Sequence, residues 1–219
     1  MAAKTSLAAK DPEERRRRIL AAAVDVLSEK GFAGTRIADV AAAAGTSPAL
    51  VVYHFGTLDG ALAEALASVE DAYYADVEAA LSPDAGAVER LRTLAGLGSE
   101  TGPAVGSWAL WMEVWVRALH DGQARALSRA LDARWKQTLR SVVDDGVWEG
   151  VFTCPDPAGT VLRLAALMDG LAVQVALRDP DVSVARMTEL WLTAASYELA
   201  VPLATLLPAP AKARPRPRR

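Results

Sequence analysis

Residues 35–55 read TRIADVAAAAGTSPALVVYHF and predict two short helices around a tight turn. Thr35 suits the N-cap of the first helix, because its side-chain oxygen can accept a hydrogen bond from a backbone N–H of the first turn. Gly45 suits the turn, because glycine tolerates positive φ. The first helix also repeats apolar residues with the period of an α-helix, at Ile37, Val40 and Ala41.

The second of these helices is predicted to begin with Ser47 as N-cap and Pro48 in the first turn, where the missing N–H of proline costs nothing. Val51 and Phe55 lie four residues apart and mark its buried face. Helices of this length are not stable alone in water. Joined by a glycine-containing turn, the pair matches a helix-turn-helix, whose second helix enters the major groove of DNA. The alternative is an ordinary corner between two helices.

The sequence around this motif, residues 15–66, resembles the N-terminal DNA-binding domain of the tetracycline-repressor (TetR) family. In that family a capped first helix ends in a Gly-Phe pair, a second helix opens with Thr, and a short recognition helix ends in an aromatic and His cluster. The resemblance implies an all-α homodimer with an N-terminal three-helix DNA-binding domain and a helical ligand-binding and dimerisation domain. The matching residues are Arg18, Ile19, Leu20, Gly31, Phe32, Thr35, Ile37, Ala38, Val40, Ala41, Ala44, Gly45, Ser47, Tyr53, His54 and Phe55.

Two positions depart from the pattern of the family. Leu58 stands where the family usually carries a Lys, just before the acidic residue that opens the fourth helix. Val52 stands where a Tyr is frequent. Both changes remove polar groups, so a phosphate contact and a base contact of the family are not expected at these two points.

Length and composition favour a helical protein with a sizeable core. The chain has 219 residues, of which 52% are hydrophobic, and a mean hydropathy of +0.14. The longest apolar stretch, 164–177, is interrupted by Asp169, so no membrane span is expected. The N-terminus shows no signal-peptide pattern. With Cys154 as its single cysteine the chain can form no internal disulfide, and a cytoplasmic location is expected.

The net charge of −3 hides an uneven distribution. Residues 1–60 hold eight Lys or Arg and seven Asp or Glu, whereas residues 212–219 hold five basic residues and no acid. The part between them is therefore strongly acidic and would be repelled by DNA phosphates. Contact with nucleic acid is expected at the N-terminal end, and the basic tail is a second candidate.

Pattern and resemblance together divide the chain into four parts. Residues 1–10 are expected to be a disordered lead, 11–56 the DNA-binding domain, 57–207 the ligand-binding and dimerisation domain, and 208–219 a disordered basic tail. About nine helices are expected in total. Beyond residue 56 they cover about 57–81, 84–99, 108–120, 122–149, 157–178 and 182–201.

The first helix is predicted to begin with Asp11 as its N-cap. Four arginines, Arg15 to Arg18, lie in its first turns. Because successive helical residues point about 100° apart, only some of the four can face one partner. We favour Arg15 and Arg18 as phosphate contacts, and the alternative is a solvated charged turn. Arg36 is a further phosphate candidate, and Thr35 could donate its backbone N–H and its hydroxyl at the start of the second helix.

The recognition helix carries few groups that can form hydrogen bonds, namely those of Ser47, Tyr53 and His54. By resemblance to the family, Tyr53 and His54 hold phosphates, and the alternative for His54 is a buried packing role. An apolar side chain can contact the methyl group of thymine, so we expect readout to depend on apolar contacts and DNA shape. The apolar candidates are Pro48, Ala49 and Val52.

Aromatic residues concentrate in the second half of the chain, and they are either core or the lining of an effector pocket. The segment 108–177 resembles the betaine-regulator-like branch of the family. Acids beside tryptophans would favour an organic cation through cation–π contact, and the polar candidates for the pocket are Glu113, Asp144, Asp169 and Gln174. The predicted pocket residues are Trp108, Trp111, Met112, Trp115, Trp135, Trp148, Met168 and Asp169.

The last two helices are expected to form the interface of a two-fold dimer, as in the family. They carry more apolar residues than one packed face needs, and such an excess on a surface implies a partner. The dimer would place two recognition helices about 34–36 Å apart, at successive major-groove faces of a palindrome. The predicted interface residues are Val161, Leu164, Met168, Leu171, Val175, Val184, Met187, Trp191 and Ala194.

Catalysis and metal binding find no support in the sequence. Its two histidines, His54 and His120, have no spacing typical of a metal site, and no glycine-rich phosphate loop or other cofactor motif occurs. The sequence therefore predicts a ligand-responsive transcriptional repressor that binds a palindromic operator as a dimer. The alternatives are a helical interaction protein whose head does not bind DNA, and a regulator without a small-molecule ligand.

Overall fold

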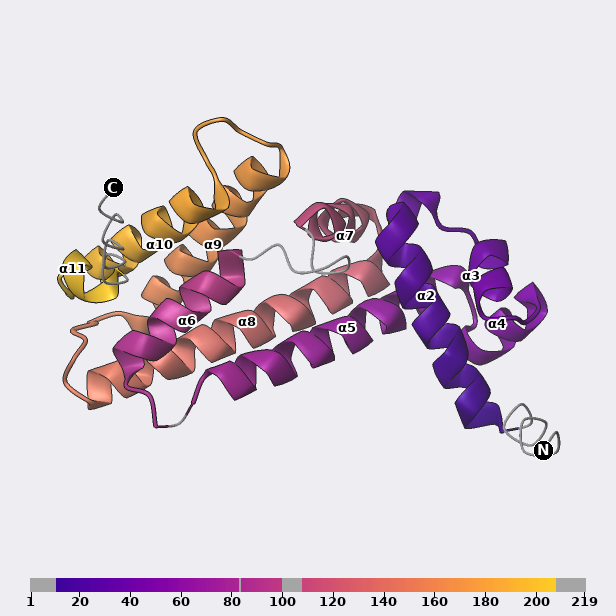
Figure 1. Cartoon of the computed structure of the whole chain (residues 1–219), viewed down its shortest axis with the longest axis horizontal. Helices are drawn as coiled ribbons and strands as arrows, with labels where there is room; N and C mark the ends of the chain where they lie inside the picture. Colours follow the sequence, from indigo (N-terminus) through magenta and orange to yellow (C-terminus); the bar gives the residue numbers. More distant parts are fainter. Residues whose placement is uncertain (1–10, 83, 100–107, 208–219) are drawn as a thin grey trace, which may run out of the picture. The chain divides into compact units, whose positions relative to one another are not determined.

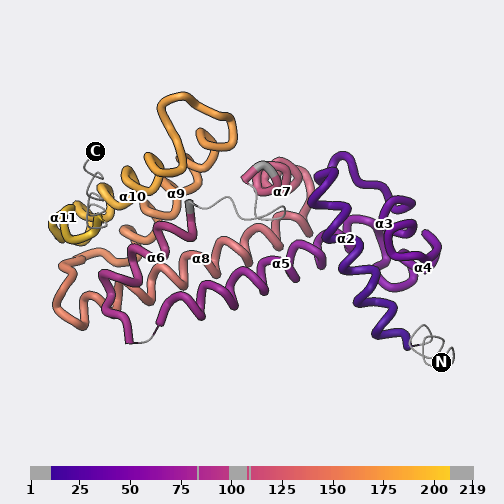
Figure 2. The backbone as a smooth tube through the Cα atoms, in the orientation of Figure 1, coloured from indigo at the N-terminus to yellow at the C-terminus, as the bar shows by residue number. Residues whose placement is uncertain are grey.

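The computed structural model describes residues 11–82, 84–99 and 108–207, and within these ranges every regular element is a helix (Figure 1). The all-α prediction is therefore confirmed, and the backbone passes through the predicted helices in order (Figure 2). The predicted lead 1–10 and tail 208–219 lie outside the described residues. The helices are α2 (Pro12–Gly34), α3 (Ile37–Ala43), α4 (Pro48–Phe55), α5 (Leu58–Ala80), α6 (Ala87–Ser99), α7 (Trp108–His120), α8 (Gly122–Trp148), α9 (Pro157–Ala176), α10 (Val184–Glu198) and α11 (Leu203–Leu206).

The chain divides into two compact units. The first comprises the described parts of 1–79 and 101–134, and the second those of 80–100 and 135–219. Helix α8 contributes its first half to one unit and its second half to the other. These units group residues by contact and not by role, so the functional division at residue 56 remains a prediction.

In the first unit, α2, α3 and α4 pack around a shared core with α5, α7 and the start of α8. Val51 and Phe55 are buried there, which confirms the predicted inner face of α4. Helix α2 is interrupted at Gly31, whose φ of 67° is accessible to glycine at little cost, and Phe32 beyond it lies in the core. The largest core side chains include Ile19, Leu27, Leu62, Leu66, Leu110 and Leu131.

Two of the three predicted caps are confirmed. Asp11 accepts a hydrogen bond from the N–H of Glu13 (3.0 Å), and Ser47 accepts one from the N–H of Leu50 (3.3 Å) ahead of α4. Each cap pairs one of the four N–H groups that a helix start leaves without a partner.

The third prediction, that Thr35 is the N-cap of α3, is wrong. Helix α3 begins at Ile37 with Arg36 as N-cap, and the N–H of Arg36 donates to Asp39 Oδ2 (3.0 Å). Thr35 is buried, and its hydroxyl donates to the carbonyl oxygen of Gly31 (2.6 Å), at the interruption of α2. The hydroxyl therefore serves the end of one helix instead of the start of the next.

The second unit is built from α6, the end of α8, and α9 to α11. Trp191 of α10 is fully buried, and its indole N–H donates to the carbonyl oxygen of Leu164 in α9 (2.9 Å). Arg92 of α6 donates to the carbonyl oxygens of Thr205 and Leu206 in the short helix α11, which the sequence did not predict.

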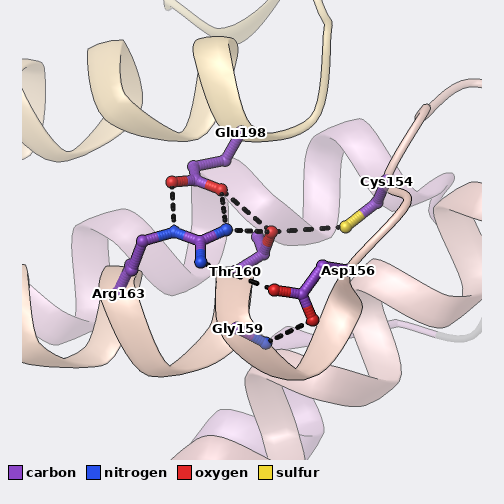
Figure 3. Close-up of polar contacts among 6 residues, drawn as sticks. All are labelled: Cys154, Asp156, Gly159, Thr160, Arg163 and Glu198. Atoms are coloured by element: carbon purple, nitrogen blue, oxygen red, sulfur yellow. Dashed lines mark hydrogen bonds and ion pairs between the residues drawn. The ribbon is translucent and has the colours of Figure 1, made fainter.

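A cluster of polar side chains joins the start of α9 to the end of α10 (Figure 3). Arg163 binds both carboxylate oxygens of Glu198 at 2.6 Å, and the hydroxyl of Thr160 donates to Glu198 Oε2 (2.9 Å). These hydrogen bonds, first of all those from Arg163, hold the pKa of the Glu198 carboxyl below its usual value. Cys154 is buried beside them, with its Sγ 3.4 Å from Thr160 Oγ1.

By length and composition alone, one helix in the described ranges, α9, is apolar enough to cross a membrane, although Asp169 interrupts its sequence. A core helix of a globular protein passes the same test. A third of its most apolar window is buried inside the protomer. The rest of that window is half-buried or exposed.

Candidate DNA-binding face and effector site

Helix α4 presents one face to solvent and packs the other into the first unit. Ser47, Pro48, Ala49 and Val52 are exposed, and the side chain of Tyr53 is 79% exposed. The outer face carries two hydroxyl groups, those of Ser47 and Tyr53. Ser47 Oγ caps the helix, so the hydroxyl of Tyr53 is the one that is not used within α4. The outer face is therefore mostly apolar, as the sequence indicated.

His54 is half-buried at the end of α4. Its ring lies edge-on to that of Tyr53 (5.2 Å between centroids) and tilted against that of Phe55 (6.2 Å). Its Nε2 atom is buried and has no hydrogen-bond partner in the described part of the chain. These contacts favour the packing alternative for His54 over a phosphate contact through Nε2.

The arginines at the start of α2 have different surroundings. Arg16 pairs with Glu64 of α5, and its guanidinium lies 5.0 Å from the centroid of the Phe55 ring. Arg17 pairs with Glu14 within α2. Arg15 is half-buried and has a polar or electrostatic contact of its own, whereas Arg18 is exposed. Arg16 thus links α2 to α5 and α4, a structural role that the sequence did not indicate.

Two residues at the start of α3 were predicted to contact phosphate. Arg36 is exposed, and its N–H is already taken by Asp39. The hydroxyl of Thr35 is buried and donates to Gly31, so the predicted donation of this hydroxyl to a phosphate is wrong.

Helix α7 is tied to the end of α2 by Glu113. Its Oε2 accepts hydrogen bonds from the backbone N–H groups of Phe32 (2.6 Å) and Ala33 (3.2 Å). A Cβ at Gly31 would lie 2.5 Å from Glu113 Oε1 and would displace this carboxylate, and the φ of 67° also favours glycine there. Arg117, one turn further along α7, pairs with Asp59 and covers the Phe32 ring at 5.2 Å. The prediction that Glu113 lines an effector pocket is therefore wrong.

We expect Glu113→Ala to loosen the end of α2. The change leaves two backbone N–H groups without their acceptor, which should lower local stability by about 1–3 kcal/mol. Hydrogen exchange at Phe32 and Ala33 measures the effect. Glu113→Gln keeps one acceptor oxygen and should show a smaller increase in exchange rate. Unchanged exchange in the Ala variant would mean that the carboxylate does not hold these groups.

The predicted pocket residues fall into separate groups. Trp111 and Trp115 of α7 lie side by side, with ring centroids 6.3 Å apart, and Trp111 packs against the core of the first unit. In the second unit, Trp135 and Met168 both lie beside Gly98 of α6, where a Cβ would be 3.2 Å and 2.7 Å from them.

Other polar and aromatic candidates do not face a pocket. Trp148 is 89% exposed at the end of α8, where the helix ends and the chain turns away, so its prediction as a pocket residue is wrong. Asp144 is exposed and pairs with Arg140 (2.7 Å), and Gln174 is exposed on α9. Asp169 is half-buried and has a polar or electrostatic contact.

Glu70 of α5 is a buried acid that the sequence reading missed. Its side chain is 7% exposed, and burial raises the pKa of its carboxyl to about 7. Tyr74, one turn on, is also buried, and the guanidinium of Arg134 lies 4.1 Å from the centroid of its ring. Arg134 also pairs with Asp71 at 2.7 Å.

Comparison with known proteins agrees with this arrangement. A family model of the bacterial regulatory proteins of the tetR family matches residues 19–65, and one of the C-terminal domain of BetI-type transcriptional repressors matches residues 87–199. The chain belongs to the TetR family. It is a DNA-binding transcriptional regulator of the BetI-like repressor type, and not an enzyme.

Relatives of this TetR-family chain cover most of its length. The HTH-type transcriptional regulator BetI of Klebsiella pneumoniae (strain 342) is 27% identical over 168 residues, which is 74% of this chain and 83% of the relative. A transcriptional regulator from Saccharomonospora viridis, solved in complex with choline, is 32% identical, with a TM-score of 0.76 over 85% of this chain and 98% of its own. A TetR-family regulator from Rhodococcus sp. is 26% identical, with a TM-score of 0.71 over 85% and 99%.

Several residues that were predicted to form the dimer interface of this TetR-family regulator lie on the inner faces of their helices. Five of them are buried inside the protomer, because they pack α9 and α10 against each other and against α6, and their prediction as partner contacts is wrong. These five are Val161, Leu164, Met168, Met187 and Trp191. Leu171, Val175 and Ala194 are half-buried, and Val184 is exposed.

The opposite face of α9 is the one that the protomer leaves open. Leu162 is 57% exposed and Leu177 is 64% exposed, and Ala166 and Gly170 lie exposed between them. Spacings of four, four and seven residues place these four on one side of the helix. Tyr197 of α10 is exposed as well. We call Leu162, Ala166, Gly170 and Leu177 the outer stripe of α9.

Proposed function

We propose that this regulator is a homodimeric, cytoplasmic repressor whose residues 11–56 bind a palindromic operator and whose residues 57–207 bind an effector and dimerise. The observation that carries the proposal is helix α4, which is capped by Ser47, anchored by Val51 and Phe55, and exposed on its other side. An outer face that is free of internal packing is what a recognition helix needs in order to enter a major groove.

Phosphate contacts and base contacts come from different residues in this proposal. Arg15, Arg18, Arg36 and Tyr53 hold phosphates and position α4, which makes binding dependent on salt. Base reading uses the exposed apolar groups and the shape of the DNA, because few polar groups face outward. The base-reading residues are Pro48, Ala49 and Val52.

The dimer is proposed to form through the outer stripe of α9 and the neighbouring surface of α10. The support is a stripe of exposed apolar residues, with the polar Gln174 beside it, that the protomer does not cover. A second copy is the partner that the family favours, and a two-fold axis would bring the same stripe from both copies together. The half-buried residues Leu171, Val175 and Ala194, with the exposed Val184, can contribute at the edge of this interface.

We expect Gly170→Glu to convert the dimer into a monomer. A Cβ at Gly170 meets no atom within 4 Å, and Glu has a higher helix propensity than Gly, so the protomer itself should tolerate the change. In the dimer two carboxylates would face each other in an apolar contact. Light scattering coupled to size exclusion measures the mass. Ala130→Glu, at an exposed position of α8, is the matched control and should stay dimeric.

The effector is proposed to be a small organic cation. The support is the relative from Saccharomonospora viridis that was solved with choline, together with the match to BetI-type repressors. Effector binding would shift the population towards a dimer whose two recognition helices no longer have the spacing of successive major-groove faces. Such a shift requires that the effector binds this second state more tightly.

The experiment for this function is a titration of the chain's own upstream DNA in the absence and presence of choline. We expect sequence-specific binding at low salt and weaker binding when choline is added, measured by fluorescence anisotropy. Absence of any binding at low salt would favour a helical interaction protein whose head does not bind DNA. Binding that choline and other ammonium compounds leave unchanged would contradict the effector proposal alone.

A further inference from the structure

Among the described residues, Glu70 is the one acidic side chain that is buried in the protomer. It lies in the inner stripe of α5, one turn after Leu66 and one turn before Tyr74, so the helix directs it towards the interior of the first unit. Among residues 11–82, 84–99 and 108–207 no group donates a hydrogen bond to its carboxylate, whose oxygens keep only slight contact with solvent. An ionised carboxylate without hydrogen bonds is unfavourable in such a place unless a positive charge accompanies it.

The charged groups that face Glu70 leave it without a dedicated counter-ion. Arg134 of α8 attracts it, but the guanidinium of Arg134 is hydrogen-bonded to Asp71 (2.7 Å) and lies over the ring of Tyr74. Asp71 repels it. Burial is the largest effect and raises the pKa of Glu70 to about 7, so the group is about half ionised at neutral pH.

The charged groups of α7 point elsewhere. Glu113 binds the end of α2, Arg117 pairs with Asp59, and His120 is exposed at the end of the helix. Asp132, two residues before Arg134 on α8, carries a negative charge that acts on Tyr74, and it has a polar or electrostatic contact of its own. None of these groups supplies a second positive charge to Glu70.

We propose that Glu70 is the residue that receives the positive charge of the effector, and that the effector is a monovalent ammonium compound. This inference rests on the proposed function, and it replaces the acids that the sequence suggested, of which Glu113 and Asp144 are engaged elsewhere. A metal ion is a poor alternative, because no group of three or more potential ligands occurs among the described residues. Tyr74 is buried one turn after Glu70 on α5, and its ring can contact an ammonium group on the face that Arg134 does not cover.

The test is calorimetric titration of the full-length protein with choline at pH 6, 7 and 8, in phosphate buffer, which contains no competing amine. A cation binds the ionised carboxylate and displaces its proton. With the pKa of Glu70 at about 7, the affinity for choline should therefore be about ten-fold higher at pH 8 than at pH 6. The neutral analogue 3,3-dimethylbutan-1-ol, which has the same shape without the charge, should bind weakly and without this pH dependence.

Glu70→Gln keeps the size of the side chain and removes its charge. We expect this variant to bind choline at least ten-fold more weakly at pH 8, to lose the pH dependence, and to lose the preference for choline over its neutral analogue. The matched control is Glu78→Gln, which removes the same charge from an exposed position on the same helix and should behave like the wild type. If the Gln variant does not fold, the number of protons that the wild type releases on binding choline tests the assignment of Glu70 instead. Titrations at pH 7 in two amine-free buffers of different ionisation enthalpy should show release of about half a proton.

The possible failures of this proposal and of the proposed function are distinct. Choline binding that is equally tight at all three pH values, or unchanged in Glu70→Gln, would overturn the assignment of Glu70 and leave the effector class standing. If neither choline nor tetramethylammonium binds the wild type at any pH, both the assignment of Glu70 and the proposal of a cationic effector are overturned.

Discussion

Replacement of Trp191 by Ala is expected to lower the free energy of unfolding of the second unit by about 3–5 kcal/mol. Trp191 is fully buried between α10 and α9, and its indole N–H donates to the carbonyl oxygen of Leu164. The truncation leaves a cavity of nearly the size of the indole ring, which the packed helices can fill only in part. Urea unfolding followed by far-UV circular dichroism measures the change.

Two further measurements separate this core role from the dimer contact that the sequence suggested for Trp191. Trp191→Phe keeps most of the ring volume and should lower stability by only about 1–2 kcal/mol. All variants should be compared at one protomer concentration, because dimerisation contributes to apparent stability. A Trp191→Ala protein that dissociates into stable, folded monomers would place Trp191 at the interface and contradict the structure.

The second large effect is expected for Ala49→Glu, which should lower the affinity for operator DNA by at least about 100-fold, because the new carboxylate would face phosphates and base-edge acceptors. The fold should not suffer. Ala49 is exposed in the first turn of α4, where an acid interacts favourably with the helix dipole. Fluorescence anisotropy with the upstream DNA measures the loss.

The matched control for Ala49→Glu is Ala75→Glu, at an exposed position of α5. It adds the same charge about 25 Å along that helix from its start, given a rise of 1.5 Å per residue. The control should lose little affinity, and the loss should vanish at higher salt. Equal losses for the two variants would show that α4 does not lie in the groove and that only net charge matters.

The sequence was sufficient to predict the features that depend on local chemistry. The caps Asp11 and Ser47 and the inner face of α4 depend on residues within one or two turns, and the structure confirms them. The predicted helix end at Gly31 is a break in α2, which continues to Gly34. Thr35 was the exception, because the free carbonyl at Gly31 competes for its hydroxyl.

The outer and inner faces of α9 could not be told apart from the sequence. The helix carries large apolar residues on both sides, with Leu164 and Met168 inside the protomer and Leu162 and Leu177 outside. Periodicity shows which residues share a face, but it does not show which face meets the protomer when both are apolar. The prediction therefore named several residues of the inner face, and the choice of these helices for the dimer interface remains a prediction.

The remaining misses depend on contacts between distant parts of the chain. Glu113 meets Phe32 across 81 positions, and Arg92 meets Leu206 across 114, so no local pattern reveals either contact. Glu70 was different, because a signal did exist. It occupies the fourth position after Leu66 in an apolar stripe that continues to Tyr74, and an acid at such a position is buried unless the stripe ends there.

The central claim is that two copies of this chain present α4 to successive major-groove faces of one operator. The most direct test is the stoichiometry of binding to the upstream DNA, measured by anisotropy and analytical ultracentrifugation at low and at moderate salt. We expect two protomers bound to one palindromic site, with an affinity that falls steeply as salt rises and that exceeds the affinity for scrambled DNA by at least about 1,000-fold. One protomer per site, or equal affinity for scrambled DNA, would contradict the claim.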